Sequence, residues 1–305
     1  MKIRVMECII ATLIIACSGC SSFGNAAVKD ELHNYPGGHM IQTIGSNIYF
    51  SDGQGVKMFD EKTDEINDVV SLDEKEFDFS KDNLINIYLL DKRIIYLSRN
   101  NNNTAYAYSL NSGDTTMLPF RARNLFVSNG NLYYMNYENN GGMLFKYDFG
   151  KEESIETITL TPISAHICPN SRGIVFVPYK EKLIRWVDND GKTIMDFDTK
   201  SVPALLAVNN SVICYTESDV LHIRDIKTSI EDEADLGNII MLWAVYDDVV
   251  YYSLEDKDGV WAYDLKSHGV SQTYEKNVSS FQICDGWMFI YQSDESSPKI
   301  IQMDT

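Results

Sequence analysis

Seven short segments of apolar and aromatic residues recur along this chain at a nearly constant spacing. Each is a quartet, and the quartets begin at Ile48, Ile94, Leu132, Ile174, Val212, Val250 and Met288. Their first residues are separated by 46, 38, 42, 38, 38 and 38 positions. Four equal spacings among six indicate a repeated structural unit rather than a chance pattern.

Polar positions mark the turns between short strands within each repeat. Most quartets follow a turn rich in Asn, Gly, Ser or Asp, such as Asp285-Gly286, and these residues tolerate tight hairpin conformations. About a dozen residues further on, a third strand ends in Asp in six repeats and in Ser109 in the second repeat. The six are Asp60, Asp148, Asp188, Asp225, Asp264 and Asp304. A second turn then leads to a fourth strand.

Four strands in a unit of roughly 40 residues match one blade of a β-propeller. The quartets are aromatic and β-branched, as expected for middle strands that are buried on both faces between neighbouring blades. We therefore predict an all-β fold, a single seven-bladed β-propeller of four-stranded antiparallel blades over residues 39–305. The last repeat lacks its own fourth strand. Either that blade has three strands, or a segment near residues 26–32 closes the ring, which would cover exposed strand edges.

The first 20 residues follow a different pattern, typical of an export signal. Lys2 and Arg4 precede an apolar stretch of eight residues, 9–16, which is too short to span a bilayer as a helix, since that needs about 20 residues. Ile14-Ile15-Ala16-Cys17 resembles a bacterial lipobox, in which the cysteine is acylated and becomes the mature N-terminus. We expect residues 1–16 to be the signal peptide.

Cys17 is the predicted lipidation site, and Cys20 is the alternative. Cys20 follows Ser18-Gly19 and lacks the aliphatic residue three positions upstream. A cleaved signal with incidental cysteines is a third interpretation. Acyl chains each contribute roughly 0.8 kcal/mol per buried methylene, so several on one cysteine hold a protein at a membrane surface. Residues 17–38 would then be a lipidated tether, and the domain would lie at the outer face of a bacterial cytoplasmic membrane.

The repeats also resemble known propeller families. The aromatic quartet on the second strand, with a turn such as Asn189-Asp190-Gly191 after the third, resembles the YWTD-type repeat of low-density-lipoprotein-receptor-like proteins. More closely, the chain resembles lipid-anchored bacterial propellers, mainly from anaerobic Gram-positives, of a domain-of-unknown-function family. The resemblance covers about residues 40–305. No repeat keeps a complete YWTD, so the resemblance implies the fold and not receptor-type ligand specificity.

Composition and charge narrow the classes of partner. The chain has 305 residues, of which 44% are hydrophobic and 23% charged, as in a globular protein with a sizeable core. The formal net charge of −18 repels phosphate backbones, so no nucleic-acid partner is predicted. The loops between second and third strands are long and polar at residues 99–104 and 137–142, and such loops gather on one face of a propeller.

Candidate catalytic and metal-binding residues do not converge in the sequence. Among the histidines His33, His39, His166, His222 and His268, only His39 and His166 fall on predicted first strands, with no third ligand at a suitable spacing. We predict no catalytic site, metal or cofactor. One segment, Asp188-Asn189-Asp190-Gly191, is similar to part of a calcium-binding loop. We predict a turn there, since a complete calcium loop needs more ligands. Cys168, Cys214 and Cys284 lie on separate predicted blades and are expected to be buried thiols without a disulfide.

The function expected from these features is recognition without catalysis. We predict a lipid-anchored binding or scaffold module that recognises a protein or glycan partner through its loop face. A candidate interaction edge is the acidic-aromatic connection after the first repeat: Asp73, Glu74, Glu76, Phe77, Asp78 and Phe79. The alternatives are a propeller lyase or hydrolase that uses the central channel, and a sensor subunit of a membrane assembly.

Overall fold

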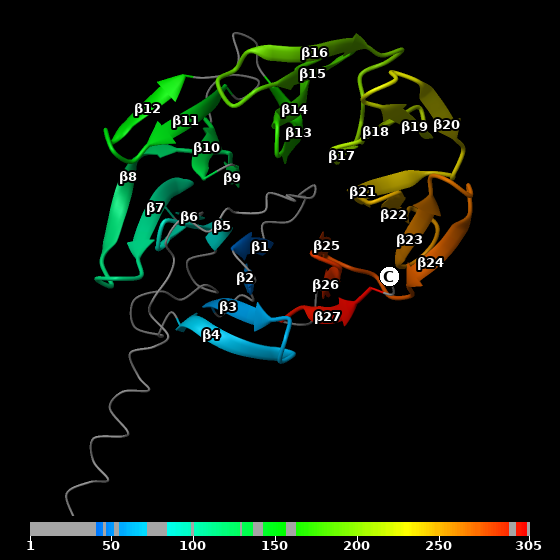
Figure 1. Ribbon diagram of the computed structural model, residues 1–305. Coiled ribbons are helices and arrows are strands. Elements are labelled where there is room, and N and C mark those ends of the chain that lie inside the picture. Colours follow the sequence, from blue (N-terminus) through cyan, green and yellow to red (C-terminus); the bar gives the residue numbers. More distant parts are fainter. Residues whose placement is uncertain are drawn as a thin grey trace, which may run out of the picture.

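The structure, a computed structural model, shows a ring of radially arranged antiparallel sheets (Figure 1). It describes residues 41–44, 47–51, 55–71, 84–98, 101–128, 130–136, 143–156, 163–292 and 297–303. These residues form 27 strands in seven sheets, and none of them is helical. Within this part of the chain there is accordingly no helix long and apolar enough to cross a membrane. The predicted seven-bladed propeller is confirmed.

The first four blades each contain four strands in chain order. Blade 1 comprises β1 (Ile41–Ile44), β2 (Asn47–Ser51), β3 (Gly55–Asp60) and β4 (Glu65–Ser71). Blade 2 comprises β5 (Leu84–Leu90), β6 (Arg93–Ser98), β7 (Thr104–Ser109) and β8 (Thr115–Arg121). Blade 3 comprises β9 (Asn124–Ser128), β10 (Asn131–Met135), β11 (Leu144–Asp148) and β12 (Glu153–Glu156). Blade 4 comprises β13 (Ile163–Asn170), β14 (Gly173–Pro178), β15 (Leu183–Val187) and β16 (Thr193–Asp198).

The remaining three blades complete the ring. Blade 5 comprises β17 (Leu206–Val208), β18 (Val212–Glu217), β19 (Val220–Asp225) and β20 (Glu231–Ala234). Blade 6 comprises β21 (Ile239–Tyr246), β22 (Val249–Leu254), β23 (Val260–Asp264) and β24 (Val270–Tyr274). Blade 7 comprises β25 (Ser280–Cys284), β26 (Trp287–Tyr291) and β27 (Lys299–Gln302), three strands among the described residues. The segment near residues 26–32, the alternative closing strand, lies outside the described residues.

Burial falls from the inner strands of each blade to the outer strand. All seven quartets lie on second strands, as predicted, and almost every quartet side chain is buried. Fourth strands are mostly exposed; β24, for example, has no buried residue. Because second strands are covered on both faces by neighbouring blades, they carry the continuous apolar runs from which the repeat was found.

The hydrophobic core is divided among the boundaries between blades. Tyr49 and Val56 of blade 1 pack against Ile94 and Tyr96 of blade 2. Further clusters of the same kind join blades 4 and 5, blades 5 and 6, and blades 6 and 7. The quartets therefore stabilise contacts between blades as well as within them, as predicted.

The turns confirm the hairpins predicted from Asn, Asp and Gly. Asp285 and Gly286 join β25 to β26 with φ values of 47° and 80°. Two consecutive left-handed residues are the signature of the tight turn whose twist matches paired strands. This backbone conformation selects Gly, Asn and Asp in such turns.

The ring closes where blade 7 meets blade 1. The Tyr291 hydroxyl donates a hydrogen bond of 2.9 Å to the Ser51 carbonyl, and the Thr43 hydroxyl donates to the Asp285 carboxylate at the same distance. The Phe50 and Phe289 rings lie 5.5 Å apart between their centroids. Side chains of the first and last described repeats thus seal this boundary in the same way as the others.

Candidate functional site

Several sites predicted from the sequence fall on residues that the structure does not describe. Cys17, Cys20 and the acidic-aromatic edge from Asp73 to Phe79 lie outside the described residues, as do His33 and His39. His166 lies on β13, a first strand, as predicted. The structure therefore brings a different set of residues forward as a candidate site.

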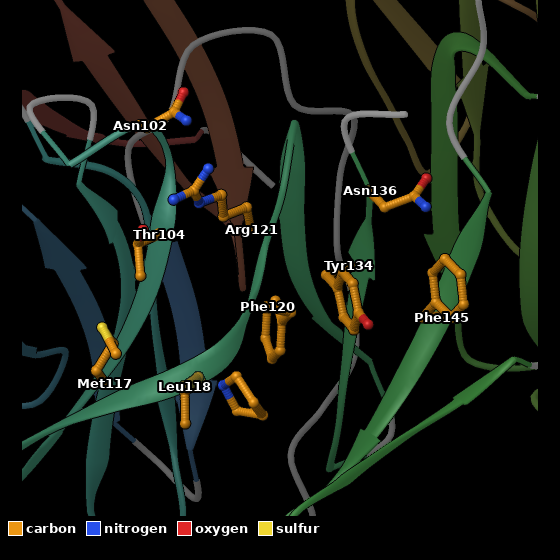
Figure 2. A pocket seen from close by; sticks show the side chains of 10 residues that line it. Asn102, Thr104, Met117, Leu118, Phe120, Arg121, Tyr134, Asn136 and Phe145 are labelled. Carbon is orange, nitrogen blue, oxygen red and sulfur yellow. The ribbon is translucent and has the colours of Figure 1, made fainter. Parts of the chain in front are cut away.

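A pocket of about 620 Å³ opens between blades 2 and 3 (Figure 2). Its volume is in the range of 300–1,000 Å³ that is usual for ligand sites. It is lined by Asn102, Thr104, Met117, Leu118, Pro119, Phe120, Arg121, Tyr134, Asn136 and Phe145. The pocket lies where β10 ends and β7 and β11 begin, at the end of the blades that carries the loops between second and third strands.

The floor of the pocket is a row of stacked aromatic rings. Figure 2 shows Phe120 of β8 facing Tyr134 of β10, with Phe145 of β11 beyond it. The Phe120 and Tyr134 centroids are 3.8 Å apart with planes 10° from parallel, and Tyr134 and Phe145 are 5.2 Å apart at 15°. Phe120 and Tyr134 are both buried. The row joins the two blades and gives the pocket an apolar base.

Among the described lining residues, the rim of the pocket is polar and includes one positively charged side chain, that of Arg121. The side chains of Asn102, Arg121 and Asn136 lie above the aromatic row in Figure 2. Arg121 is exposed, and the Asn136 amide oxygen accepts a hydrogen bond of 3.0 Å from the Met143 N–H. At the opposite side, Met117 is 63% exposed. An apolar base with a polar, positively charged edge suits an apolar side chain next to an anionic group.

One further aromatic side chain, Tyr147, packs against the aromatic row. Tyr147 lies beneath Phe120, with 5.2 Å between ring centroids. Burial raises the pKa of Tyr147, and the nearby Glu152 and Asp148 carboxylates raise it further. Among the described residues that line the pocket, Arg121 is the one with a charged side chain.

Backbone hydrogen bonds hold the walls of the pocket in place. The N–H of Ala122 donates to the carbonyl of Asn103 at 3.0 Å, within blade 2. The N–H of the next residue, Arg123, donates to the carbonyl of Met135 in blade 3 at 2.7 Å. The connection after β8 is thus bonded to both blades, so Arg121 is presented from a rigid element.

The backbone conformation of the Asn-rich loop beside the pocket explains why it contains Asn. Asn102 and Asn103 have φ values of 53° and 55°, in the left-handed region that Asn tolerates better than most residues. The sequence singled out residues 99–104 as a long polar loop, and Asn102 and Thr104 of this segment line the pocket. The loop at 137–142 lies outside the described residues.

The aromatic row itself was not predicted, because its members come from three strands in two blades. One signal in the sequence was available. Residues 117–120 read Met-Leu-Pro-Phe and form part of β8, a fourth strand, whereas other fourth strands are largely polar. An apolar run on an outer strand indicates a surface that is covered by something other than solvent.

Comparisons with solved structures agree with the fold. The propeller domain of Cps50 (Swd1) from Myceliophteria thermophila matches with a TM-score of 0.57 at 7% identity, over 85% of this chain and 94% of that one. A chain of the Mitotic Checkpoint Complex matches with a TM-score of 0.56 at 9% identity, over 85% and 84%. The extracellular domain of BT4673 from B. thetaiotaomicron gives 0.55 at 11%, over 85% and 39%.

These similarities show the propeller fold and nothing finer. No family model and no curated protein matches the sequence. The predicted kinship with lipid-anchored bacterial propellers stays a prediction.

Proposed function

We propose that this chain is a lipid-anchored recognition module outside the cytoplasmic membrane, which binds a partner protein in the pocket between blades 2 and 3. The observation that carries this proposal is the aromatic base with the Arg121 rim. A partner side chain that is apolar enters the pocket, and an acidic residue next to it pairs with Arg121. Buried anchors of this kind dominate the energy of protein interfaces. Binding of this kind requires no catalytic group.

The geometry of the rings favours a protein over a glycan. Sugar rings bind best on the flat face of an exposed aromatic ring. Here Phe120 and Tyr134 cover each other's faces at 3.8 Å, and both are buried. The pocket therefore offers depth to an inserted side chain rather than a flat platform to a sugar.

Site-specific photo-crosslinking in cells tests this pocket. A photoreactive amino acid at Met117, 63% exposed on the fourth strand of blade 2, is compared with one at Val270, 51% exposed on the fourth strand of blade 6. We expect a discrete protein adduct at position 117 and none at position 270. Equal labelling at both positions, or no protein adduct at 117, contradicts the proposal.

Arg121→Glu then tests the role of the cation. Arg121 is exposed, so the substitution leaves the core intact. We expect the adduct at position 117 to weaken by about fivefold or more, the loss that accompanies a central interface residue. Arg123→Glu, an exposed neighbour that does not line the pocket, is the matched control and should leave the adduct unchanged. If the adduct is unchanged in Arg121→Glu, Arg121 does not take part in recognition.

Membrane fractionation tests the anchor separately. We expect Cys17→Ser to leave the protein unprocessed or to release it from membranes, because the acyl chains supply the membrane affinity. Cys20→Ser should remain membrane-bound. If Cys20→Ser is released and Cys17→Ser stays lipidated, the lipid is on Cys20. If neither substitution changes fractionation, the anchor is not a lipid at this motif.

A further inference from the structure

A second cluster of functional side chains lies at the boundary between blades 4 and 5, away from the pocket. His222 is in the middle of β19, and its cross-strand neighbours are Tyr215 on β18 and Glu233 on β20. Glu231, two residues before Glu233, projects from the same face of β20. Three adjacent strands thus place an imidazole, two carboxylates and a phenol side by side.

The potential ligand atoms of this cluster face one another. His222 Nδ1 lies 3.1 Å from Glu231 Oε1 and 3.6 Å from Glu233 Oε1. All three ligand atoms lie within 4.8 Å of one another. Zn–N and Zn–O bonds of 2.0–2.2 Å in a tetrahedral site place neighbouring ligand atoms roughly 3.4 Å apart. The two distances from Nδ1 agree with that spacing.

A buried carboxylate orients the His222 ring from behind. Glu217 Oε2 lies 3.7 Å from His222 Nε2, and both side chains are only 4% exposed. The other Glu217 oxygen accepts the Ser201 N–H at 3.1 Å, which fixes the carboxylate in place. A carboxylate behind the second ring nitrogen is the usual outer partner of a metal-binding histidine. His222 Nδ1 lies within hydrogen-bond distance of Glu231 Oε1, and when the ring proton is on Nε2, on the Glu217 side, Nδ1 presents its lone pair to Glu231 and Glu233.

Tyr215 and Arg224 fix the position of the Glu231 carboxylate. The Tyr215 ring stacks on His222 with 4.9 Å between centroids and 10° between planes, and its hydroxyl donates to Glu231 Oε1 at 3.0 Å. The Arg224 guanidinium holds Glu231 Oε2 at 3.2 Å and lies on the Phe197 ring. Glu231 Oε1 is therefore held toward His222.

With no proton on His222 Nδ1, its lone pair and the two carboxylate oxygens form a set of three donor atoms that can hold a cation. We propose that His222, Glu231 and Glu233 bind a divalent transition-metal ion of the Zn²⁺ type. One nitrogen and two oxygen ligands suit Zn²⁺ better than Ca²⁺, which takes six to eight oxygens. Three protein ligands leave a fourth position for water or for a group of a partner. The ion joins β20, a largely exposed outer strand, to β19.

Lys200 allows a specific test, because its ammonium group would compete with the metal ion for the Glu233 carboxylate. Its ammonium nitrogen lies 2.8 Å from Glu233 Oε1, the same oxygen that faces His222. This contact holds the pKa of Glu233 below its ordinary value. Metal binding must displace the ammonium group, so removal of Lys200 should strengthen binding.

Calorimetric titration of the chelator-treated full chain, free of any histidine tag, with Zn²⁺ tests the site. We expect one ion per chain, and a loss of affinity of roughly tenfold or more in His222→Gln and in Glu233→Gln. Glu233 is 50% exposed, so its variant keeps the test valid if the buried His222 variant fails to fold. Lys200→Ala should bind about two- to fivefold more tightly, since an exposed ion pair is lost. His268→Gln, at a described histidine in the turn between β23 and β24, should match the parent.

Three outcomes would overturn the proposal. The first is the absence of Zn²⁺ binding to the chelator-treated chain. The second is equal affinity in His222→Gln, Glu233→Gln and His268→Gln. The third is tighter binding of Ca²⁺ than of Zn²⁺. Visible absorption of the Co²⁺-substituted protein, lost in Glu233→Gln, gives an independent readout of ligation.

Discussion

At the scale of the residue, the Asp that ends most third strands accepts hydrogen bonds from the turn that follows it. In blade 5, Asp225 Oδ1 accepts the N–H groups of Lys227 and Thr228 at 2.9 and 2.7 Å. Asp264 does the same for Lys266 and Ser267 in blade 6. In blade 2, Ser109 Oγ accepts the N–H of Ser112 at 3.3 Å. The repeat thus selects a short side-chain acceptor that closes the turn into the fourth strand.

These turns predict a pH dependence of stability. Hydrogen bonds from Thr228 and Ser267 hold the pKa of Asp225 and of Asp264 below the ordinary value of 3.8. A depressed folded-state pKa contributes stability that is present above pH 3.8 and is lost as the pH falls through the folded value. The double variant Asp225→Asn, Asp264→Asn keeps the acceptor oxygens but loses the charge.

We therefore expect this variant to melt below the parent at pH 7 and to approach it between about pH 5 and pH 2. Melting temperatures across this range check the expectation. Asp219→Asn, at an exposed turn residue, is the control. The difference between its melting temperature and that of the parent should stay constant over this pH range. A gap that is constant with pH would show that the charge of the two carboxylates does not matter.

The same turns store backbone strain at one position. The residue four places after the Asp or Ser has positive φ in five blades: Asp64, Gly113, Glu152, Ser229 and His268. Only blade 2 has Gly there. Ser229 is exposed at φ 59°, and a left-handed conformation disfavours side chains with a Cβ.

Ser229→Gly should therefore stabilise the protein by about 0.5–1 kcal/mol. Chemical denaturation measures the change in the free energy of unfolding. Ser229→Ala, which keeps the Cβ, should show no gain. A glycine variant no more stable than the alanine variant would indicate that the strain is already relieved by neighbouring contacts.

At the scale of the element, two glycines in corresponding hairpins are needed for different physical reasons. Gly173 begins β14, has φ 149°, and a Cβ there would lie 1.9 Å from the Val187 carbonyl oxygen of β15. Gly130, in the turn before β10, has φ 67° and open space around it. Gly173 is required by the close approach of a neighbouring strand, whereas Gly130 is required only by its backbone conformation.

Alanine substitution separates these two causes. Gly173→Ala should cost about 3 kcal/mol or more, since the strand pair must move apart. Gly130→Ala should cost about 1 kcal/mol, from the left-handed conformation alone. The difference is measured by denaturant unfolding. Equal costs at the two positions would show that β14 and β15 adjust freely.

At the scale of the whole molecule, ring closure makes the last repeat indispensable. β27 pairs with β26, and Ile300 packs against the cluster that joins blade 7 to blade 1. Ile301 and Met303 pack at the boundary between blades 6 and 7. One short strand therefore supports two boundaries.

Deletion of residues 297–305 should abolish cooperative unfolding or lower the melting temperature by roughly 10 °C or more. The physical reason is the loss of partly buried apolar surface at both boundaries and of the strand pairing with β26. Gln302→Ala, an exposed change within the retained strand, is the control and should melt like the parent. A truncated chain that melts like the parent would mean that blade 7 is not part of the closed ring.

The sequence by itself determined the number of blades, the position of the second strand in each and the residues buried on it. Repetition made this possible, since the apolar quartets from Ile48 to Met288 recur at the period of one blade and are buried by their neighbours in the same way. The Asn-rich loop beside the pocket was also found, because turn chemistry is local.

Only the tertiary structure decided which side chains meet across blades. Phe120 and Tyr134 come from different blades, and Lys200 reaches Glu233 from the connection before blade 5. Nothing in the sequence indicated a site at His222. Strand pairing puts Glu233 directly opposite it, and the Glu217 carboxylate lies near its other ring nitrogen. Such contacts depend on register and on the packing of one sheet against the next, which no local pattern encodes.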